Sequence, residues 1–141
     1  MKKSLLLVLA LTTAPASAEW TRVTANVEGD VYYMDWATLK PTALGGRIWG
    51  LVDLKKPKAD GARSYKGLTE YDCQEERVRS LQYCGYPKSM GDGTPLRCDN
   101  SPGAWVYVIP DTIGASNLKL VCSALNPPGQ SRYLADDSRM V

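Results

Sequence analysis

The sequence has no histidine and no phenylalanine among its 141 residues. Histidine is the commonest general base and the commonest metal ligand, and it is the side chain whose unperturbed pKa lies between pH 5 and 8. Its absence excludes Ser-His-Asp and Cys-His nucleophile systems and His-ligated zinc or iron sites. Ser64 and Ser80 therefore have no such base to activate them. We expect a protein that is not an enzyme and that needs no cofactor.

Long apolar runs are also scarce, and the longest is Leu5–Leu11. Lys2 and Lys3 precede it, and the small residues Ala16-Ser17-Ala18 follow. This order is typical of a secretory signal peptide and predicts cleavage after Ala18, so residues 1–18 would be removed. The run is too short for a transmembrane helix, which needs about 20 apolar residues. There is no cysteine near the cleavage site to which a lipid anchor could be attached. We therefore expect an exported protein that is periplasmic, secreted or at the cell surface.

An excess of positive charge is missing as well. Two of the 17 basic residues, Lys2 and Lys3, lie in the predicted signal peptide, and the other 15 balance the 15 acidic residues. Nucleic-acid binding requires a basic excess to neutralise phosphates. We therefore do not expect a nucleic-acid partner.

Four cysteines are present after the signal peptide, with no CxxC spacing: Cys73, Cys84, Cys98 and Cys122. An even number in an oxidising compartment predicts two structural disulfides. If residues 65–73 and 77–84 form a hairpin, Cys73 and Cys84 lie on the order of 20 Å apart, which exceeds the ~7 Å limit for bridged Cα atoms. Of the two remaining pairings we favour Cys73–Cys122 with Cys84–Cys98. The first joins a central strand to the C-terminal element, and the second closes a Gly/Pro-rich loop.

Alternating and β-rich segments predict about six strands, at residues 20–27, 31–35, 47–54, 62–73, 77–84 and 105–109. The turn at Gly29 joins the first two into a hairpin, and residues 36–40 read as a turn-like segment that Pro41 ends. Residues 85–103 are rich in Gly, Pro and Asp and are expected to be mostly loop. Because phenylalanine is absent, the four tryptophans are expected as the bulky members of the core: Trp20, Trp36, Trp49 and Trp105.

The pattern changes to helical spacing after Pro110, at Leu118, Val121, Cys122 and Leu125. Asp111, Thr112 and Ser116 are candidate N-caps, and Pro127 would end the helix. Antiparallel strands followed by one helix predict an α+β fold, with a single domain over residues 19–126. Residues 127–141 are polar and are expected to form a flexible tail.

A basic cluster is the main candidate for a ligand-binding surface: Lys55, Lys56, Lys58, Arg63 and Lys66, with Tyr65 among them. Only Asp60 opposes these five charges between residues 55 and 66. Such a surface suits acidic protein segments or sulfated glycans. The alternative is a solvated loop whose charges maintain solubility and protect a sheet edge.

Carboxylates gather in the predicted hairpin of residues 62–84, at Glu70, Asp72, Glu75 and Glu76. Paired carboxylates can perform acid–base catalysis, but Arg77 and Arg79 adjoin these four. Cross-strand ion pairs are therefore the simpler interpretation. Asp92 between two glycines matches no calcium-binding loop and is read as part of a turn.

Several motifs in order resemble the surface-adhesin protein E family of exported bacterial proteins. They are Val31-Tyr32-Tyr33-Met34-Asp35, Ala62-Arg63-Ser64, Tyr71-Asp72-Cys73, Met90-Gly91-x-Gly93, Trp105 and Ile109-Pro110-Asp111-Thr112…Leu120-Val121-Cys122. The resemblance implies a small antiparallel sheet with a C-terminal helix, and it also implies a Cys73–Cys122 disulfide. It further implies an adhesin that binds host matrix or plasma proteins such as vitronectin and laminin, with a homodimer as a further expectation.

The resemblance also bears on the basic cluster, because the basic segment before the strand that ends in Cys73 is implicated in ligand binding in related adhesins. Arg63 and Lys66 match basic positions there. The chain departs from the lipid-anchored type of the family in lacking a cysteine at the cleavage site, and it carries a second pair outside the family pattern, Cys84 and Cys98. The alternative function is a periplasmic structural or assembly-accessory protein that binds another envelope protein and no host ligand.

Overall fold

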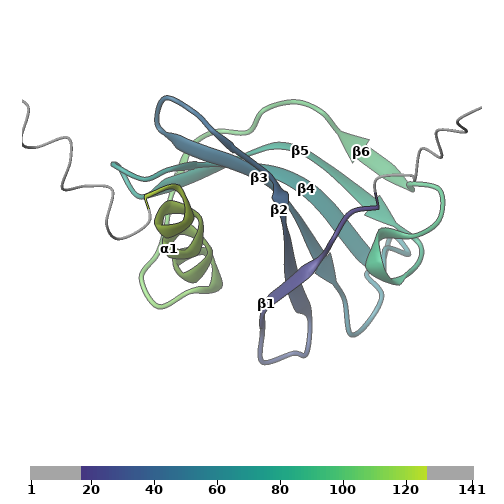
Figure 1. The fold of residues 1–141 in the computed structure, drawn as a ribbon. Coiled ribbons are helices and arrows are strands. Elements are labelled where there is room, and N and C mark those ends of the chain that lie inside the picture. The colour runs from purple at the N-terminus through teal and green to yellow at the C-terminus, as the bar shows by residue number, and fades with distance from the viewer. Residues whose placement is uncertain (1–16, 127–141) are drawn as a thin grey trace, which may run out of the picture.

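A computed structural model describes residues 17–126 as one curved antiparallel sheet with a helix against one face (Figure 1). The strands are β1 (Thr21–Ala25), β2 (Val31–Pro41), β3 (Gly45–Asp53), β4 (Ser64–Asp72), β5 (Arg77–Tyr86), β6 (Arg97–Asp99) and β7 (Val106–Tyr107). They lie in the order β1-β2-β3-β4-β5-β6, with β7 also paired to β5, and helix α1 spans Ile113–Leu125. The predicted α+β class is confirmed. Most of the predicted signal peptide and the whole predicted tail lie outside the described residues.

Helix α1 packs across one end of the sheet, on what we call the helix-side face. The core between them consists of Met34, Ile48 and Tyr71 from the sheet and Leu118 and Val121 from the helix. Burial raises the pKa of Tyr71 to about 12. The helix begins after Thr112, whose hydroxyl accepts a hydrogen bond from the backbone N–H of Ala115, so one of the three candidate caps is confirmed.

Both predicted disulfides are present. Cys73 at the end of β4 is bonded to Cys122 of α1, which fastens the helix to the sheet. Cys84 and Cys98 are directly opposite residues of β5 and β6, and their bond joins these two strands.

The prediction of a turn-like segment at residues 36–40 is wrong, because these residues continue β2. The pairing of β2 with β3 is irregular between Asp35 and Lys40. The Thr38 hydroxyl donates to the Asp35 carbonyl at 2.6 Å and accepts from the Trp49 N–H at 3.1 Å. A side chain therefore supplies hydrogen bonds that the interrupted ladder lacks, and the strand resumes beyond the bulge.

The prediction that the tryptophans are the bulky members of the core is wrong. All four are half-buried, and only Trp36 among them packs against the core cluster. Trp105 lies instead over the guanidinium groups of Arg77 and Arg79. Tyr71 and Ile48 fill the space under the helix. The core therefore needs neither phenylalanine nor tryptophan at its centre.

The Gly/Pro-rich segment of residues 85–103 is mostly loop as predicted, but it also contains the short strand β6 and a 3-10 turn, η1 (Ser89–Gly91). The turn is held against the sheet by two side chains. Ser64 Oγ donates to the Lys88 carbonyl at 2.6 Å and accepts from the Gly91 N–H at 2.8 Å. Asp53 Oδ1 accepts from the Met90 N–H at 2.8 Å. The loop therefore covers the face of β3 and β4 opposite the helix.

Candidate binding surface

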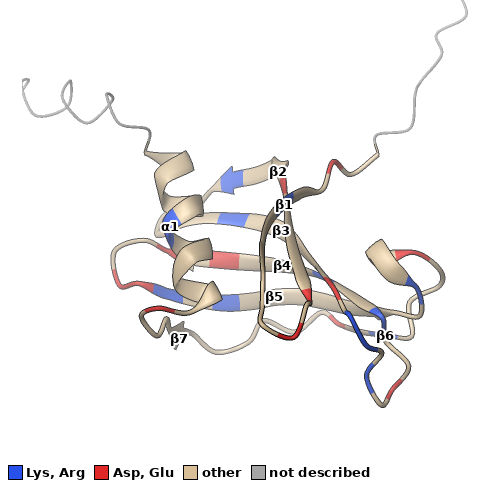
Figure 2. Ribbon diagram, turned by 90° about the horizontal axis from the view of Figure 1, so that it is seen from below, with Lys and Arg blue, Asp and Glu red and all other residues tan. Residues whose placement is uncertain are grey.

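The exposed basic residues lie in the loop between β3 and β4, where Figure 2 shows several blue segments close together. The side chains of Lys55, Lys56, Lys58 and Arg63 are all exposed. We call these four residues the basic surface. Its acidic neighbour Asp60 is also exposed, and its Oδ1 accepts a hydrogen bond from the Ala62 N–H at 3.0 Å. Asp60 therefore holds the turn of the loop, and its single negative charge offsets only one of the four positive charges.

Backbone hydrogen bonds hold this loop in a defined shape. The Lys58 N–H donates to the Ala62 carbonyl at 2.9 Å, and the Gly61 N–H donates to the Lys58 carbonyl at 2.9 Å. Gly61 has φ +85°, a conformation that a side chain would strain. The Arg63 N–H donates to the Tyr86 carbonyl at 2.8 Å, which ties the end of the loop to β5. The basic side chains thus project from an ordered scaffold.

Asp30 anchors the start of the loop. Its Oδ1 accepts from the Lys55 N–H at 2.9 Å, and its Oδ2 accepts from Asn26 Nδ2 at 3.0 Å. These hydrogen bonds, together with the charge of Lys58, hold the pKa of Asp30 below its usual value. Asp30, Glu28 and the loop lysines surround a cleft of about 400 Å³ between the β1–β2 turn and the loop.

Lys66 does not join the basic surface, although it is close in sequence. It lies on the opposite face of β4, with Nζ 4.8 Å from the centre of the Tyr86 ring. A methyl group on Gly91 would overlap its Cε, so the loop of residues 88–93 lies directly over its stem. The sequence contains a sign that Lys66 lies apart from Tyr65, because consecutive residues of a strand point to opposite faces of the sheet.

Tyr65, the remaining predicted site residue, faces the helix side. Its ring lies over Gly85, where an added Cβ would be 3.1 Å from Cε1. Burial, with smaller contributions from Asp60 and Tyr83, raises the pKa of Tyr65. Tyr65 also lines a hollow of about 480 Å³ on this face, together with Tyr32 and Tyr83. Sequence reasoning missed this hollow, because it depends on how the strands are paired.

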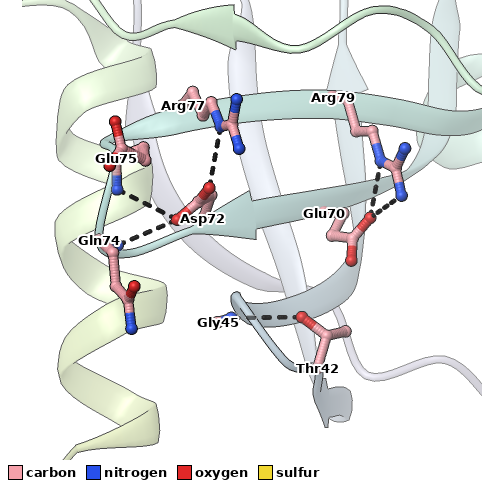
Figure 3. Close-up of polar contacts among 8 residues, drawn as sticks. All are labelled: Thr42, Gly45, Glu70, Asp72, Gln74, Glu75, Arg77 and Arg79. Atoms are coloured by element: carbon pink, nitrogen blue, oxygen red, sulfur yellow. Dashed lines mark hydrogen bonds and ion pairs between the residues drawn. The ribbon is translucent and has the colours of Figure 1, made fainter.

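The predicted ion pairs are confirmed on β4 and β5 (Figure 3). Arg77 Nε lies 2.9 Å from Asp72 Oδ2, and both Nε and Nη2 of Arg79 lie 2.7 Å from Glu70 Oε2. Asp72 also accepts from the N–H groups of Glu75 and Gln74, and these bonds with Arg77 hold the pKa of Asp72 below its usual value. The Trp105 ring lies over both guanidiniums, 5.0 and 4.6 Å from their carbon atoms. Asp72 and Glu70 thus act as acceptors that hold the hairpin.

Two other features bear on chemistry. Asp92 accepts from the Gly93 N–H at 2.8 Å, which is consistent with its predicted place in a turn. Across residues 17–126, no group of three or more potential metal-ligating side chains of the His, Cys, Asp and Glu types comes together. Over the same range, no helix has both the length and the apolar composition needed to cross a membrane.

These observations define a small disulfide-bonded α+β protein that presents an ordered basic surface. Residues 20–123 match the family described as surface-adhesin protein E, and the chain belongs to this family. A search of curated proteins finds no match.

Solved structures of protein E from Haemophilus influenzae share the fold. One has a TM-score of 0.60 and 19% sequence identity, covering 83% of this chain and 92% of that chain. A second crystal form has a TM-score of 0.59 and 18% identity, covering 85% and 98%. The structure from a non-typeable strain has a TM-score of 0.58 and 19% identity, covering 83% of each chain.

Proposed function

We propose that this protein is an exported, non-enzymatic surface adhesin that binds a host matrix or plasma protein through the basic surface. Membership of the surface-adhesin protein E family supports the class. The single observation that carries the proposed site is the grouping of Lys55, Lys56, Lys58 and Arg63 on a loop ordered by backbone hydrogen bonds. Tyr65 and Lys66, which the sequence also predicts for this site, lie in β4 outside the basic surface.

The physical basis of binding is electrostatic attraction to an acidic protein segment or a sulfated glycan. Each exposed ion pair contributes about 1 kcal/mol or less, so several must form together. Charges farther apart than about 10 Å are screened at 0.1 M salt. An ordered loop helps here, because it holds four cations close together without the entropy cost of ordering a flexible segment on binding.

The test is binding of the purified protein to immobilised vitronectin and laminin by surface plasmon resonance. The variant Lys55→Glu/Lys56→Glu/Lys58→Glu reverses three charges of the basic surface. Arg22→Glu/Lys40→Glu/Lys119→Glu is the matched control, because it makes the same change in net charge at exposed positions of β1, β2 and α1.

We expect saturable binding by the wild type to at least one of the two proteins. The loop variant should lose at least tenfold in affinity, and the control variant should lose less than threefold. Equal losses in the two variants would refute the basic surface as the site. No saturable binding by the wild type would favour the alternative of an envelope protein without a host ligand.

A further inference from the structure

Two glycines face each other at the centre of the helix-side face. Gly50 of β3 is paired with Gly67 of β4, and Met34 and Tyr83 continue this row on β2 and β5. Helix α1 lies along one side of the row, and its residue Asn117 lines the hollow there. On the other side lie Tyr32, Val52 and Tyr65, which form the neighbouring row across β2, β3 and β4. The result is the hollow of about 480 Å³, which we call the glycine trough.

The fold does not require glycine at Gly50, whereas at Gly67 a side chain would fit only tightly. Neither Gly50 nor Gly67 has a positive φ. A Cβ on Gly50 would approach nothing closer than the Tyr33 carbonyl at 3.5 Å, and one on Gly67 would meet the Gln82 carbonyl at 3.3 Å. Glycine inside a strand destabilises it by roughly 0.5–1 kcal/mol relative to alanine. Such a glycine often marks a place where a ligand or another backbone approaches closely.

The lining of the trough offers apolar surface and phenolic hydroxyl groups. Tyr32, Tyr65 and Tyr83 contribute rings with hydroxyl groups at their ends. The Asn117 Oδ1 atom is buried and has no hydrogen-bond partner among the described residues. A buried acceptor without a donor is costly. Because Asn117 Oδ1 is closed to solvent, it lies behind the surface of the trough and is not offered to a bound molecule.

The trough is continuous with the basic surface. Asp30 and Lys58 line both the trough and the cleft beside the loop. The carboxylate of Asp30 already accepts hydrogen bonds from Lys55 and Asn26. The loop end of the trough therefore presents the positive charge of Lys58. Lys55 and Lys56 line the adjoining cleft together with Glu28, so the excess of positive charge there favours an acidic group on a bound molecule.

We propose that the glycine trough binds an extended peptide segment of a protein partner. Apolar or proline side chains lie over Gly50 and Gly67 between the tyrosine rings. Acidic residues of the same segment meet Lys58 and the other loop lysines. Aromatic-lined grooves are a recurrent way to bind such extended segments. This site deepens the proposed function and rests on it, because the segment would belong to the partner that the basic surface attracts.

The test begins with random twelve-residue peptides displayed on phage and selected on the wild-type protein. The enriched peptides are synthesised with a fluorophore, and their dissociation constants are measured by fluorescence polarisation. Gly50→Leu fills the trough. Gly103→Leu is the matched control, because Gly103 is exposed, lies outside the trough and has no positive φ.

We expect enriched peptides in which an apolar or proline-containing run adjoins Asp or Glu. Their dissociation constant should rise at least tenfold with Gly50→Leu and less than twofold with Gly103→Leu. No enriched peptide, peptides without acidic residues, or equal affinity for the Gly50→Leu protein would overturn the proposal. Selective binding of uncharged glycans in the trough, detected on a glycan array and lost with Gly50→Leu, would also overturn it.

Folding is checked by thermal unfolding of each variant. If Gly50→Leu does not fold, Tyr83→Ala replaces it, with Tyr107→Ala as its control, because Tyr107 is 65% exposed on β7 and lies outside the trough. Refutation of the glycine trough as a peptide site can be distinguished from refutation of the proposed function. If Gly50→Leu leaves peptide binding intact while reversal of the loop lysines abolishes vitronectin or laminin binding, the trough is refuted and the basic surface stands.

Discussion

The Asp30 carboxylate accepts a hydrogen bond at 2.9 Å from the backbone N–H of Lys55, which lies 25 residues further along the chain. The turn between β1 and β2 thereby fixes the first residue of the basic surface. Because the backbone N–H makes this contact, the Lys55 side chain remains exposed to solvent. A buried carboxylate thus orders the start of the cationic loop through its backbone and leaves the lysine side chain exposed.

Stability should fall in acid through Asp30 and Asp72. The pKa of each is below its usual value in the folded protein, so each stabilises the fold at pH values above the pKa of the unfolded chain, about 4. This contribution is lost as the pH falls through the lowered folded-state pKa. We expect the melting temperature, measured by circular dichroism, to decrease steadily from pH 5 to pH 2.5.

Two variants test whether Asp72 causes part of the loss of stability in acid. Asp72→Asn should flatten the pH dependence and lower the melting temperature at pH 6, because the amide cannot form the ion pair with Arg77. Glu28→Gln is the control, since Glu28 is an exposed carboxylate. A pH profile of Asp72→Asn that is parallel to the wild type would contradict this assignment.

The core under the helix should dominate stability. Ile48 is 1% exposed and packs in the core cluster, whereas Ile109 is 70% exposed. We expect Ile48→Ala to lower the free energy of unfolding by about 2–5 kcal/mol. Ile109→Ala should change it by less than about 0.5 kcal/mol. Denaturant unfolding measures both, and similar values for the two variants would show that this core is misplaced.

The two disulfides should differ in their contribution. The sequence separation is 49 residues for Cys73–Cys122 and 14 for Cys84–Cys98. Chain-entropy estimates then give about 4 and about 3 kcal/mol respectively. Replacing each pair by serine and measuring denaturant unfolding tests this order. A larger loss on removal of Cys84–Cys98 would mean that strain or residual structure, and not loop length, sets the difference.

Because the loop lies over Lys66, we expect substitutions of Gly91 and Lys66 to have coupled effects on the free energy of unfolding. Gly91 has φ +68°, and its Cβ would overlap the Lys66 side chain. Gly91→Ala should therefore lower the free energy of unfolding by about 1–3 kcal/mol. Shortening Lys66 to alanine in the same protein should recover part of that loss, since the overlap disappears while the strain in φ remains.

A double-mutant cycle of Gly91→Ala and Lys66→Ala measures this coupling. Gly103→Ala serves as the control for glycine replacement, because an added Cβ there meets nothing closer than the Ser80 carbonyl at 3.6 Å. Strictly additive effects would mean that the end of the Lys66 side chain moves aside without cost, and would contradict the predicted coupling.

The predictable features are those that depend on local pattern. Period-two alternation predicted the long strands, and helical spacing predicted α1. The hairpin argument excluded only Cys73–Cys84, and the correct pairing was favoured because it joins a central strand to the C-terminal element and closes the Gly/Pro-rich loop. The bulge at residues 36–40 was missed because the Thr38 hydroxyl bonds to Trp49 across the sheet, a contact between distant residues. The short strand β6 was missed because three residues carry too weak a pattern, and pairing with β5 defines it.

The candidate site was predictable only in part for the same reason. Lys55, Lys56 and Lys58 are neighbours in sequence and remain together in the structure, whereas Lys66 lies on the far side of the sheet beneath residues 88–93. The glycine trough depends on Gly50 lying opposite Gly67. That relationship is set by strand register, which the composition of either strand alone does not specify.

Lysine footprinting of the complex with vitronectin or laminin, whichever binds more tightly, tests the central claim most directly. The free and bound proteins are acetylated briefly, and the modification of each lysine is measured by mass spectrometry. We predict that the partner protects Lys55, Lys56 and Lys58 at least fivefold and leaves the exposed residues Lys40 and Lys119 unchanged. Protection of Lys40 or Lys119 with unchanged labelling of the three loop lysines would place the binding surface elsewhere.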